Sequence, residues 1–350
     1  MAGTDVVDGG RTRAQAASAD RPAVASVPSA IAGPKRPSGT GVLILTPPIA
    51  GLTRGPARGT LPAMPIERAF VAGAGLMGHG IAQVLAAAGR TVDLYEPDPA
   101  RAAAGRERIA ANLERAVAKG RLDATSRIEI LDRIAATDRI AAAGEADLVV
   151  EAIFEDEAAK RTLWAAIDAV APGRAIFATN TSSISIDRLA DALAPARRPA
   201  FCGMHFFSPV PVMPLVELIR GSATDDATID AVRTLAGDLG KQVIVSADRP
   251  GFLVNRILMP LLAEAMRALE EGTGTAEDID TGARVGLNHP MGPLALADFI
   301  GLDVVLGIMR VLHADLGDER FRPPRVLEDL VAAGNLGQKT GTGFFTHPRA

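Results

Sequence analysis

The chain has 350 residues, enough for two domains, and its 48% hydrophobic and 22% charged residues are typical of an ordinary globular protein. A net charge of -4 without blocks of like charge gives no basic surface for nucleic acid, and no apolar run is long enough to span a membrane. One cysteine excludes an intrachain disulfide and the five histidines form no close-spaced metal motif, so we expect a cytoplasmic small-molecule enzyme without a metal.

Residues 1–63 are predicted to be a disordered N-terminal extension. Ala, Gly, Pro, Ser and Thr dominate the segment, basic residues outnumber acids, and no helical or strand period is sustained. Its one apolar stretch, residues 41–46, is too short and too far from the start for a signal peptide. The segment is therefore interpreted as a dispensable tail, with a transit peptide as the alternative. As a third possibility, translation begins at Met64, directly before the first predicted strand.

A strand, a glycine loop and a helix then follow in the order that a dinucleotide-binding fold requires. The strand is expected over residues 68–72, the helix over residues 78–89, and a second strand over residues 91–95. The first glycine of the loop allows a tight turn, the second lets the backbone approach a pyrophosphate, and the third lets helix and strand pack closely. The loop reads Gly73, Ala74, Gly75, Leu76, Met77, Gly78.

Glu96 ends the second strand and indicates which dinucleotide is bound. A carboxylate at this position hydrogen-bonds the ribose hydroxyls of NAD and, with Asp98 beside it, repels the 2′-phosphate of NADP. NAD is therefore the expected cofactor. The alternative is that Glu96 is an ordinary exposed carboxylate at a strand end.

Three further apolar runs, residues 147–153, 175–179 and 200–205, alternate with helical segments. This order predicts an α/β fold with a parallel, doubly wound sheet of the Rossmann type, whose ligands bind at the carboxyl ends of the strands. The polar residues just beyond those ends are therefore candidate site residues: Glu155, Lys160, Asn180, Thr181, Ser182, Ser183 and His205.

His205 and Glu217 are the candidate acid–base pair. Three prolines stiffen the connection from His205 to a short strand over residues 215–219, so that the two side chains can meet across a turn. Oxidation of an alcohol needs a base that titrates near neutrality, which an imidazole oriented by a carboxylate provides. On spacing alone, His205 could equally be a core histidine and Glu217 a solvated residue. Cys202 should point to the opposite face of its strand and be a buried structural residue.

After Pro250 the strand pattern stops, and helices are expected over residues 252–271, 276–285, 294–316 with a break near Gly301, and 324–333. We therefore expect a nucleotide-binding domain over residues 64–249 and an all-α C-terminal domain for substrate binding and dimerisation over residues 250–350. Four apolar residues on one stripe of the first helix are interpreted as core, although such helices also suit a dimer interface. They are Leu253, Ile257, Leu261 and Leu262.

From Met64 to its end, the chain resembles the 3-hydroxyacyl-CoA dehydrogenases, including the bacterial 3-hydroxybutyryl-CoA dehydrogenases. The motifs that carry the resemblance are, in order, GAGLMGHGIAQ, VVEAIFED, NTSS, HFFSPVPVMPLVEL, PGFLVNR, HPMGPLALADFIGLD and LGQKTGTGFF. The resemblance implies a homodimer that oxidises an L-3-hydroxyacyl-CoA with NAD, or performs the reverse reduction. The chain departs from many relatives at Ser208, often an asparagine, and at Pro214, often a lysine.

The resemblance also implies roles for individual residues. His205 would be the base, oriented by Glu217, while Ser182 and Asn255 would contact the reacting oxygen and the thioester. Those expected to touch the cofactor are Glu155, Lys160, Ser182, Ser208 and Lys339. Arg115, Lys119 and Arg121, near a helix end, are candidates for the CoA phosphates; otherwise they form a charged helical face.

Two other functions fit the same motifs. A dehydrogenase of a free 3-hydroxy acid, of the gulonate type, would differ in its substrate. A non-catalytic NAD-binding sensor would use the glycine loop without needing His205. Replacing His205 discriminates the enzyme from the sensor, because only the enzyme loses its function.

Overall fold

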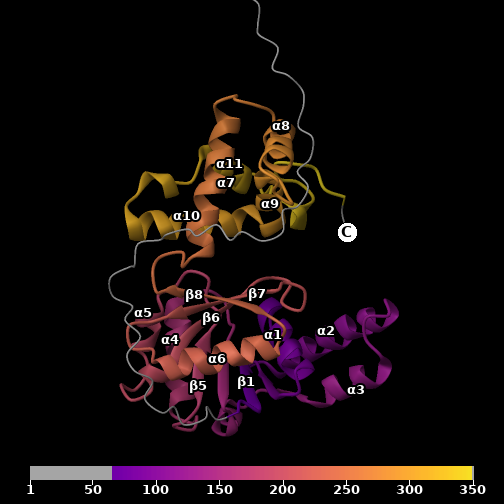
Figure 1. Ribbon diagram of the computed structural model, residues 1–350, viewed down its shortest axis with the longest axis vertical. Helices are drawn as coiled ribbons and strands as arrows, with labels where there is room; N and C mark the ends of the chain where they lie inside the picture. Colours follow the sequence, from indigo (N-terminus) through magenta and orange to yellow (C-terminus); the bar gives the residue numbers. More distant parts are fainter. Residues whose placement is uncertain (1–64, 349–350) are drawn as a thin grey trace, which may run out of the picture. The chain divides into compact units, whose positions relative to one another are not determined.

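The computed structural model describes residues 65–348 (Figure 1). The extension predicted for residues 1–63 and the alternative start at Met64 therefore lie outside the described residues. One eight-stranded sheet dominates the first part of the chain, with the strand order β3-β2-β1-β4-β5-β6-β7-β8. Its strands are β1 (Arg68–Ala72), β2 (Thr91–Tyr95), β3 (Ile134–Thr137), β4 (Leu148–Glu151), β5 (Ile176–Thr179), β6 (Phe201–Phe206), β7 (Leu215–Arg220) and β8 (Gln242–Ala247).

The sheet is parallel except at one pair. β6 and β7 run antiparallel, while β8 runs parallel to β7. The parallel, doubly wound sheet predicted for β1, β2, β4, β5 and β6 is therefore confirmed, and β7 follows β6 through the turn that was expected to bring His205 and Glu217 together. The connection over residues 207–214 is a short turn, and a parallel neighbour would need a much longer crossover.

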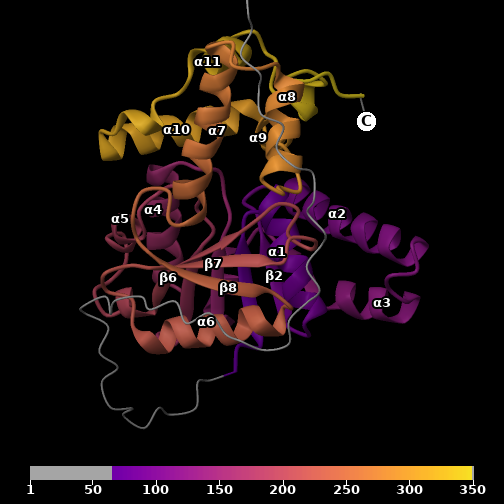
Figure 2. The ribbon, with the colours of Figure 1, turned by 45° about the horizontal axis from the view of Figure 1, so that its top comes forward.

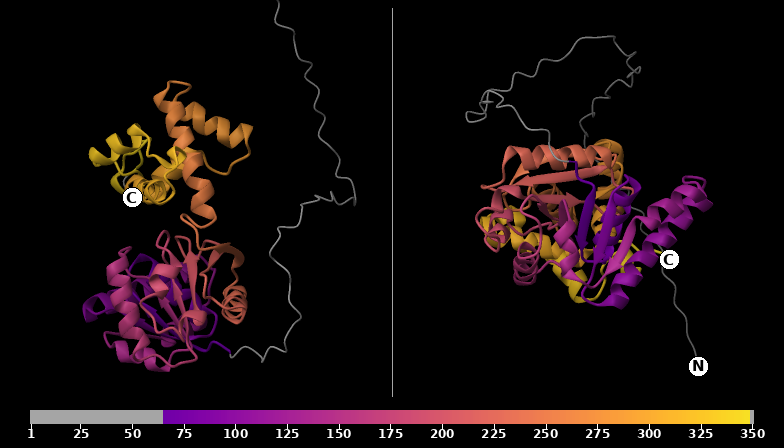
Figure 3. Two further views of the ribbon diagram at one scale, coloured as in Figure 1. Left: turned by 90° about the vertical axis from the view of Figure 1, so that its left-hand side faces the viewer. Right: turned by 90° about the horizontal axis from the view of Figure 1, so that it is seen from below.

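Helices cover both faces of the sheet, so the fold is doubly wound (Figures 2 and 3). One face packs against α1 (Leu76–Ala87), α2 (Pro99–Ala118), α3 (Ala124–Asp132) and α6 (Asp226–Asp238). The other packs against η1 (Ile140–Glu145), α4 (Glu157–Asp168) and α5 (Ile186–Ala190). Because β4 is covered on both faces, all of its residues are buried, which explains its uninterrupted apolar run.

The rest of the described chain is helical and has its own apolar core. Its elements are α7 (Val254–Glu270), α8 (Ala276–Thr281) with a π-helical turn (Gly282–Gly286), α9 (Pro293–Ile300), α10 (Leu302–Leu316) and α11 (Arg325–Ala332). Short 3-10 turns are η2 (Arg198–Ala200), η4 (Glu319–Phe321) and η5 (Gln338–Thr340). The predicted break at Gly301 is confirmed: its φ of 104° separates α9 from α10. Within residues 65–348, every helix is too short or too polar to cross a bilayer.

The predicted apolar stripe on α7 is only partly a core feature. Leu262 is fully buried, but Leu253, Ile257 and Leu261 are exposed by 42%, 63% and 37%. The helix packs on the helical core through a neighbouring face that includes Met259. The prediction that the whole stripe is packed is therefore wrong, and three of its residues form an exposed apolar strip.

Candidate active site

The glycine loop connects β1 to α1 and is shaped by close backbone contacts. A Cβ atom added at Gly73 would lie 2.5 Å from the carbonyl oxygen of Ala152, and one at Gly78 would lie 1.7 Å from that of Gly73. At Gly75, by contrast, an added Cβ would meet nothing within 4 Å. The first and third glycines are therefore required by the packing of the loop, and the second leaves open space in front of the backbone, as a pyrophosphate site needs.

A cavity of about 360 Å³ opens beside this loop. It is lined by Ala74, Gly75, Leu76, His79, Glu96, Arg101, Ala104 and Arg108. One carboxylate oxygen of Glu96 accepts the Ala74 amide at 2.9 Å, and the other lies 3.6 Å from Nε of Arg101. The carboxylate thus stands at the cavity wall, where it could accept ribose hydroxyls, so the residues present fit the adenosine half of a dinucleotide.

His205 and Glu217 face each other across the β6–β7 pair, in register. Nδ1 of His205 lies 3.1 Å from Oε2 of Glu217, and both side chains are buried. The other oxygen of Glu217 accepts the amide of Leu253 at 2.7 Å, just before α7. Because Nδ1 is directed at the carboxylate, Nε2 is the nitrogen left to exchange a proton with a ligand.

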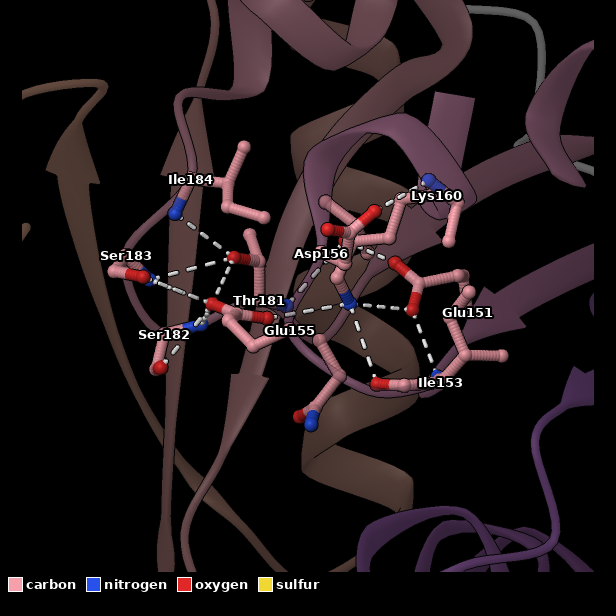
Figure 4. Close-up of polar contacts among 12 residues, drawn as sticks. Glu151, Ile153, Glu155, Asp156, Lys160, Thr181, Ser182, Ser183 and Ile184 are labelled. Atoms are coloured by element: carbon pink, nitrogen blue, oxygen red, sulfur yellow. Dashed lines mark hydrogen bonds and ion pairs between the residues drawn. The ribbon is translucent and has the colours of Figure 1, made fainter. Parts of the chain in front are cut away.

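Glu155 organises the loop that follows β5 (Figure 4). Its Oε1 accepts the Thr181 hydroxyl at 2.6 Å, the Ser182 and Ser183 amides at 2.9 and 3.1 Å, and the two serine hydroxyls at 3.2 and 3.0 Å. Burial raises the pKa of Glu155, but the ammonium of Lys160 and these hydrogen bonds outweigh burial and lower the pKa overall. Glu155 is therefore an ionised carboxylate that acts only as an acceptor.

Ser182 and Asn255 lie side by side. The amide nitrogen of the Asn255 side chain donates to the carbonyl oxygen of Ser182 at 3.2 Å, and Asn255 is buried. The loop after β5 is thereby tied to the first turn of α7, the same helix whose start is held by Glu217. The two residues that the resemblance assigned to the substrate are thus brought together.

Lys160 is buried between two carboxylates. Only 1% of its side chain is exposed, and its ammonium contacts Oε1 of Glu151 at 2.6 Å and Oε2 of Glu155 at 3.3 Å. Its position in α4 turns the side chain inward, where two carboxylates enclose its charge, and the expected contact with the cofactor stays a prediction.

The remaining predicted residues are spread over the molecule. Ser208 is exposed in the turn between β6 and β7, and Lys339 forms an ion pair with Asp303 in the helical part. Arg115 and Lys119 are exposed at the end of α2. The structure thus gives these four no contact with His205. Cys202 is buried, and burial raises the pKa of its thiol to about 12, so the expected structural role is confirmed.

Three charged residues near the site were not predicted from the sequence. Glu151 ends β4 with no exposed surface, and the unusual acid that closes an apolar strand was a readable signal. Arg101 lines the cavity from α2 and carried no such signal. Lys241 donates to the carbonyl oxygens of Val210 and Met213 at 2.7 and 2.8 Å, and so bridges the turn between β6 and β7.

Two family models match the chain. The NAD-binding domain of 3-hydroxyacyl-CoA dehydrogenase matches residues 68–249, and the C-terminal domain of 3-hydroxyacyl-CoA dehydrogenase matches residues 251–347. Together they span nearly all of the described residues.

Individual relatives agree with the family models. A probable 3-hydroxybutyryl-CoA dehydrogenase of Bacillus subtilis is 46% identical over 285 residues, which cover 81% of this chain and 98% of the relative. The mitochondrial hydroxyacyl-coenzyme A dehydrogenase of Sus scrofa is 39% identical, with 81% and 91% covered. The crystal structure of (S)-3-hydroxybutyryl-CoA dehydrogenase from Ralstonia eutropha superposes with a TM-score of 0.78 at 43% identity, covering 81% of this chain and 99% of that one.

Proposed function

The chain belongs to the 3-hydroxyacyl-CoA dehydrogenase family and is an NAD-dependent oxidoreductase, and from this premise we propose that it interconverts L-3-hydroxybutyryl-CoA and acetoacetyl-CoA. The observation that carries the proposal is the buried pair of His205 and Glu217, which lies at the carboxyl ends of the parallel strands, as the glycine loop does. The names of the similar proteins support the choice of a short acyl chain.

His205 carries the proton in the proposed mechanism. In the oxidation, Nε2 takes the proton of the 3-hydroxyl group while the hydrogen on C3 leaves as hydride. Bound NAD supplies the hydride acceptor. Glu217 keeps Nδ1 protonated and stabilises the imidazolium, and in the reduction the same imidazolium returns the proton to the oxygen.

Ser182 and Asn255 position the acyl group. The hydroxyl of Ser182 and the side-chain amide of Asn255 are neutral donors, suited to the reacting oxygen and to the thioester carbonyl. Their mutual contact fixes both before a ligand arrives. Arg115 and Lys119, exposed at the end of α2, are proposed to meet the CoA phosphates, and Ser208 and Lys339 the cofactor.

Replacing His205 with Gln tests the mechanism. The neutral amide cannot exchange a proton, so kcat should fall by at least about 100-fold while NADH binding is retained. Turnover is followed by NADH absorbance with acetoacetyl-CoA, and binding by NADH fluorescence. Full activity in this variant would overturn the assignment of His205 and favour a sensor, for which only the glycine loop matters.

Substrate choice is tested with the unmodified protein. Acetoacetyl-CoA, longer 3-ketoacyl-CoA esters and free 3-hydroxy acids are compared, and each assay is repeated with the phosphorylated cofactor. We expect the highest kcat/KM with acetoacetyl-CoA. A higher value with a free 3-hydroxy acid would instead support a dehydrogenase of the gulonate type.

The two parts of the chain are proposed to have different functions. Residues 64–249 form the NAD-binding domain, and residues 250–350 supply part of the acyl-CoA site and the contact between the subunits of a homodimer. The exposed apolar strip on α7, made of Leu253, Ile257 and Leu261, supports the second role, because exposed strips of this kind commonly mark interfaces.

A further inference from the structure

A buried ion pair lies behind the loop that follows β5. Lys160 and Glu151 are 1% and 0% exposed, and their charged atoms are 2.6 Å apart. Both oxygens of Glu151 are also used by neutral donors, since the Thr179 hydroxyl and the Ile153 amide donate to it at 2.6 and 2.8 Å. Each oxygen of Glu151 therefore has a neutral donor in addition to the ammonium of Lys160.

Glu155 is the second carboxylate that contacts Lys160, and it lies closer to the surface than Glu151. Oε2 of Glu155 lies 3.3 Å from the Lys160 ammonium, and Oε1 collects the donors of residues 181–183 on its other side (Figure 4). Glu155 is 36% exposed, so it stands between the interior and the surface of the site. A protonated carboxyl there would put a further donor where five donors already converge.

We propose that Lys160 is a positioning residue: anchored by Glu151, it holds Glu155 as the acceptor that shapes the loop of residues 181–183. Through the carbonyl of Ser182, that loop also fixes Asn255 of α7. The proposal rests on the proposed function in so far as Ser182 and Asn255 contact the acyl group.

A dependence on pH follows from the charges around Glu155. The charged groups that face it are Lys160 and, behind Lys160, Glu151; residues 181–183 bring only hydroxyls and amides. The pKa of Glu155 is lowered, so the ordering of the loop is present above the ordinary pKa of a glutamate and is lost only as pH falls through the lowered value. Removing the ammonium raises the pKa of Glu155 and moves this loss to higher pH.

The experiment uses the double variant Glu151→Gln, Lys160→Met, which removes both buried charges together and leaves no unpaired one. Reduction of acetoacetyl-CoA is measured, because in this direction His205 gives up a proton and acid does not deprive the reaction of its proton donor. Between about pH 7.5 and about pH 5.5, the variant should lose at least about fourfold more activity than the unmodified protein.

Two further variants isolate the cause. Adding Glu155→Gln to the double variant removes the titrating group, so the additional acid loss should disappear. Glu157→Gln is the matched control, since Glu157 lies on the same helix and pairs with Arg188 at the exposed surface. It should leave the profile unchanged. An acid loss that persists in the triple variant, or a double-variant profile that superimposes on that of the unmodified protein, overturns the proposal.

A second measurement does not depend on activity. Hydrogen exchange at the amides of residues 181–184 should be faster at acid pH in the double variant than in the Glu157→Gln control. If acetoacetyl-CoA is not reduced even by the unmodified protein, the proposed function fails, and this exchange still decides the positioning role. If the double variant does not fold, Glu155→Gln alone should accelerate the same exchange at every pH, and unchanged exchange overturns the proposal.

Discussion

At the scale of single residues, Glu217 shows how one buried carboxylate joins two parts of the site. Its two oxygens serve different partners, the imidazole of His205 and the backbone amide of Leu253 before α7. The orientation of the proposed base is therefore coupled to the position of the helix that carries Asn255. A group of this kind cannot be moved without disturbing both the proton transfer and the acyl site.

Glu96 supports a prediction about cofactor choice. Its carboxylate lies at the cavity wall close to Arg101, and Arg108 lines the same cavity. Glu96→Ser removes the charge that repels a 2′-phosphate and leaves the two cations that could attract one. We expect the ratio of kcat/KM for NADPH over NADH to rise by at least about tenfold, measured by initial rates with acetoacetyl-CoA.

The role of Arg101 is separated by a second substitution. In the Glu96→Ser background, Arg101→Ala should lower kcat/KM for NADPH and leave that for NADH nearly unchanged. Equal losses with both cofactors would contradict a phosphate contact. An unaltered cofactor ratio in Glu96→Ser itself would mean that Glu96 is not the discriminating residue, the alternative that the sequence left open.

At the scale of elements, the side chain of Lys241 bridges the turn between β6 and β7. Lys241 precedes β8 and donates to two carbonyls of that turn, and burial lowers the pKa of its ammonium. Lys241→Met keeps the aliphatic stem and removes both hydrogen bonds. We expect the free energy of unfolding in urea to fall by about 1–3 kcal/mol and kcat to fall with it, because the turn connects His205 to Glu217.

Arg233 offers a matched control for this substitution. It is exposed on α6, so Arg233→Met should change neither the unfolding free energy nor the turnover appreciably. A Lys241→Met protein that is destabilised but turns over at the normal rate would show that the two hydrogen bonds of Lys241 contribute to stability alone.

The strands show which elements of the fold can be predicted from sequence patterns and which cannot. β1 and β2 have the predicted bounds because each is a short apolar run next to a recognisable loop. β3 and β8 were not predicted, since they are the edge strands of the sheet and their residues are largely exposed or half-buried. The pairing of β7 with β6 was expected from the prolines that follow His205, because a periodicity alone does not give the direction of a strand.

Some site residues could likewise be predicted from the sequence, whereas the surroundings of others could not. Ser182 was identifiable because polar residues after parallel strands gather at one edge of a sheet. Lys160 was assigned to the cofactor because only the identity of the residue was visible, whereas its burial between Glu151 and Glu155 depends on the packing of α4 against the sheet. Sequence spacing therefore gives the position of a charged residue along the chain, but not whether its side chain points into the interior or into the ligand site.

At the scale of the whole molecule, the helical part leaves apolar surface uncovered. The exposed strip lies on α7, and the first turn of this helix carries Asn255 of the candidate site. A partner that packs on the strip would therefore also restrain Asn255. Burying several apolar side chains of this size is worth several kcal/mol before the entropy of association is subtracted. A homodimer formed through α7 would thereby couple the subunit contact to the acyl site.

Ile257, 63% exposed at the centre of the strip, is the residue to test. Ile257→Asp places a charge where apolar surface must be desolvated, so it should shift the protein from dimer towards monomer in light scattering at micromolar concentration. Ile128→Asp is the control, because Ile128 is similarly exposed, by 55%, but lies on α3. A monomeric unmodified protein would refute the homodimer, whereas a dimeric Ile257→Asp would place the interface elsewhere. If the coupling to Asn255 holds, the monomeric variant should also show a raised KM for acetoacetyl-CoA with little change in NADH binding.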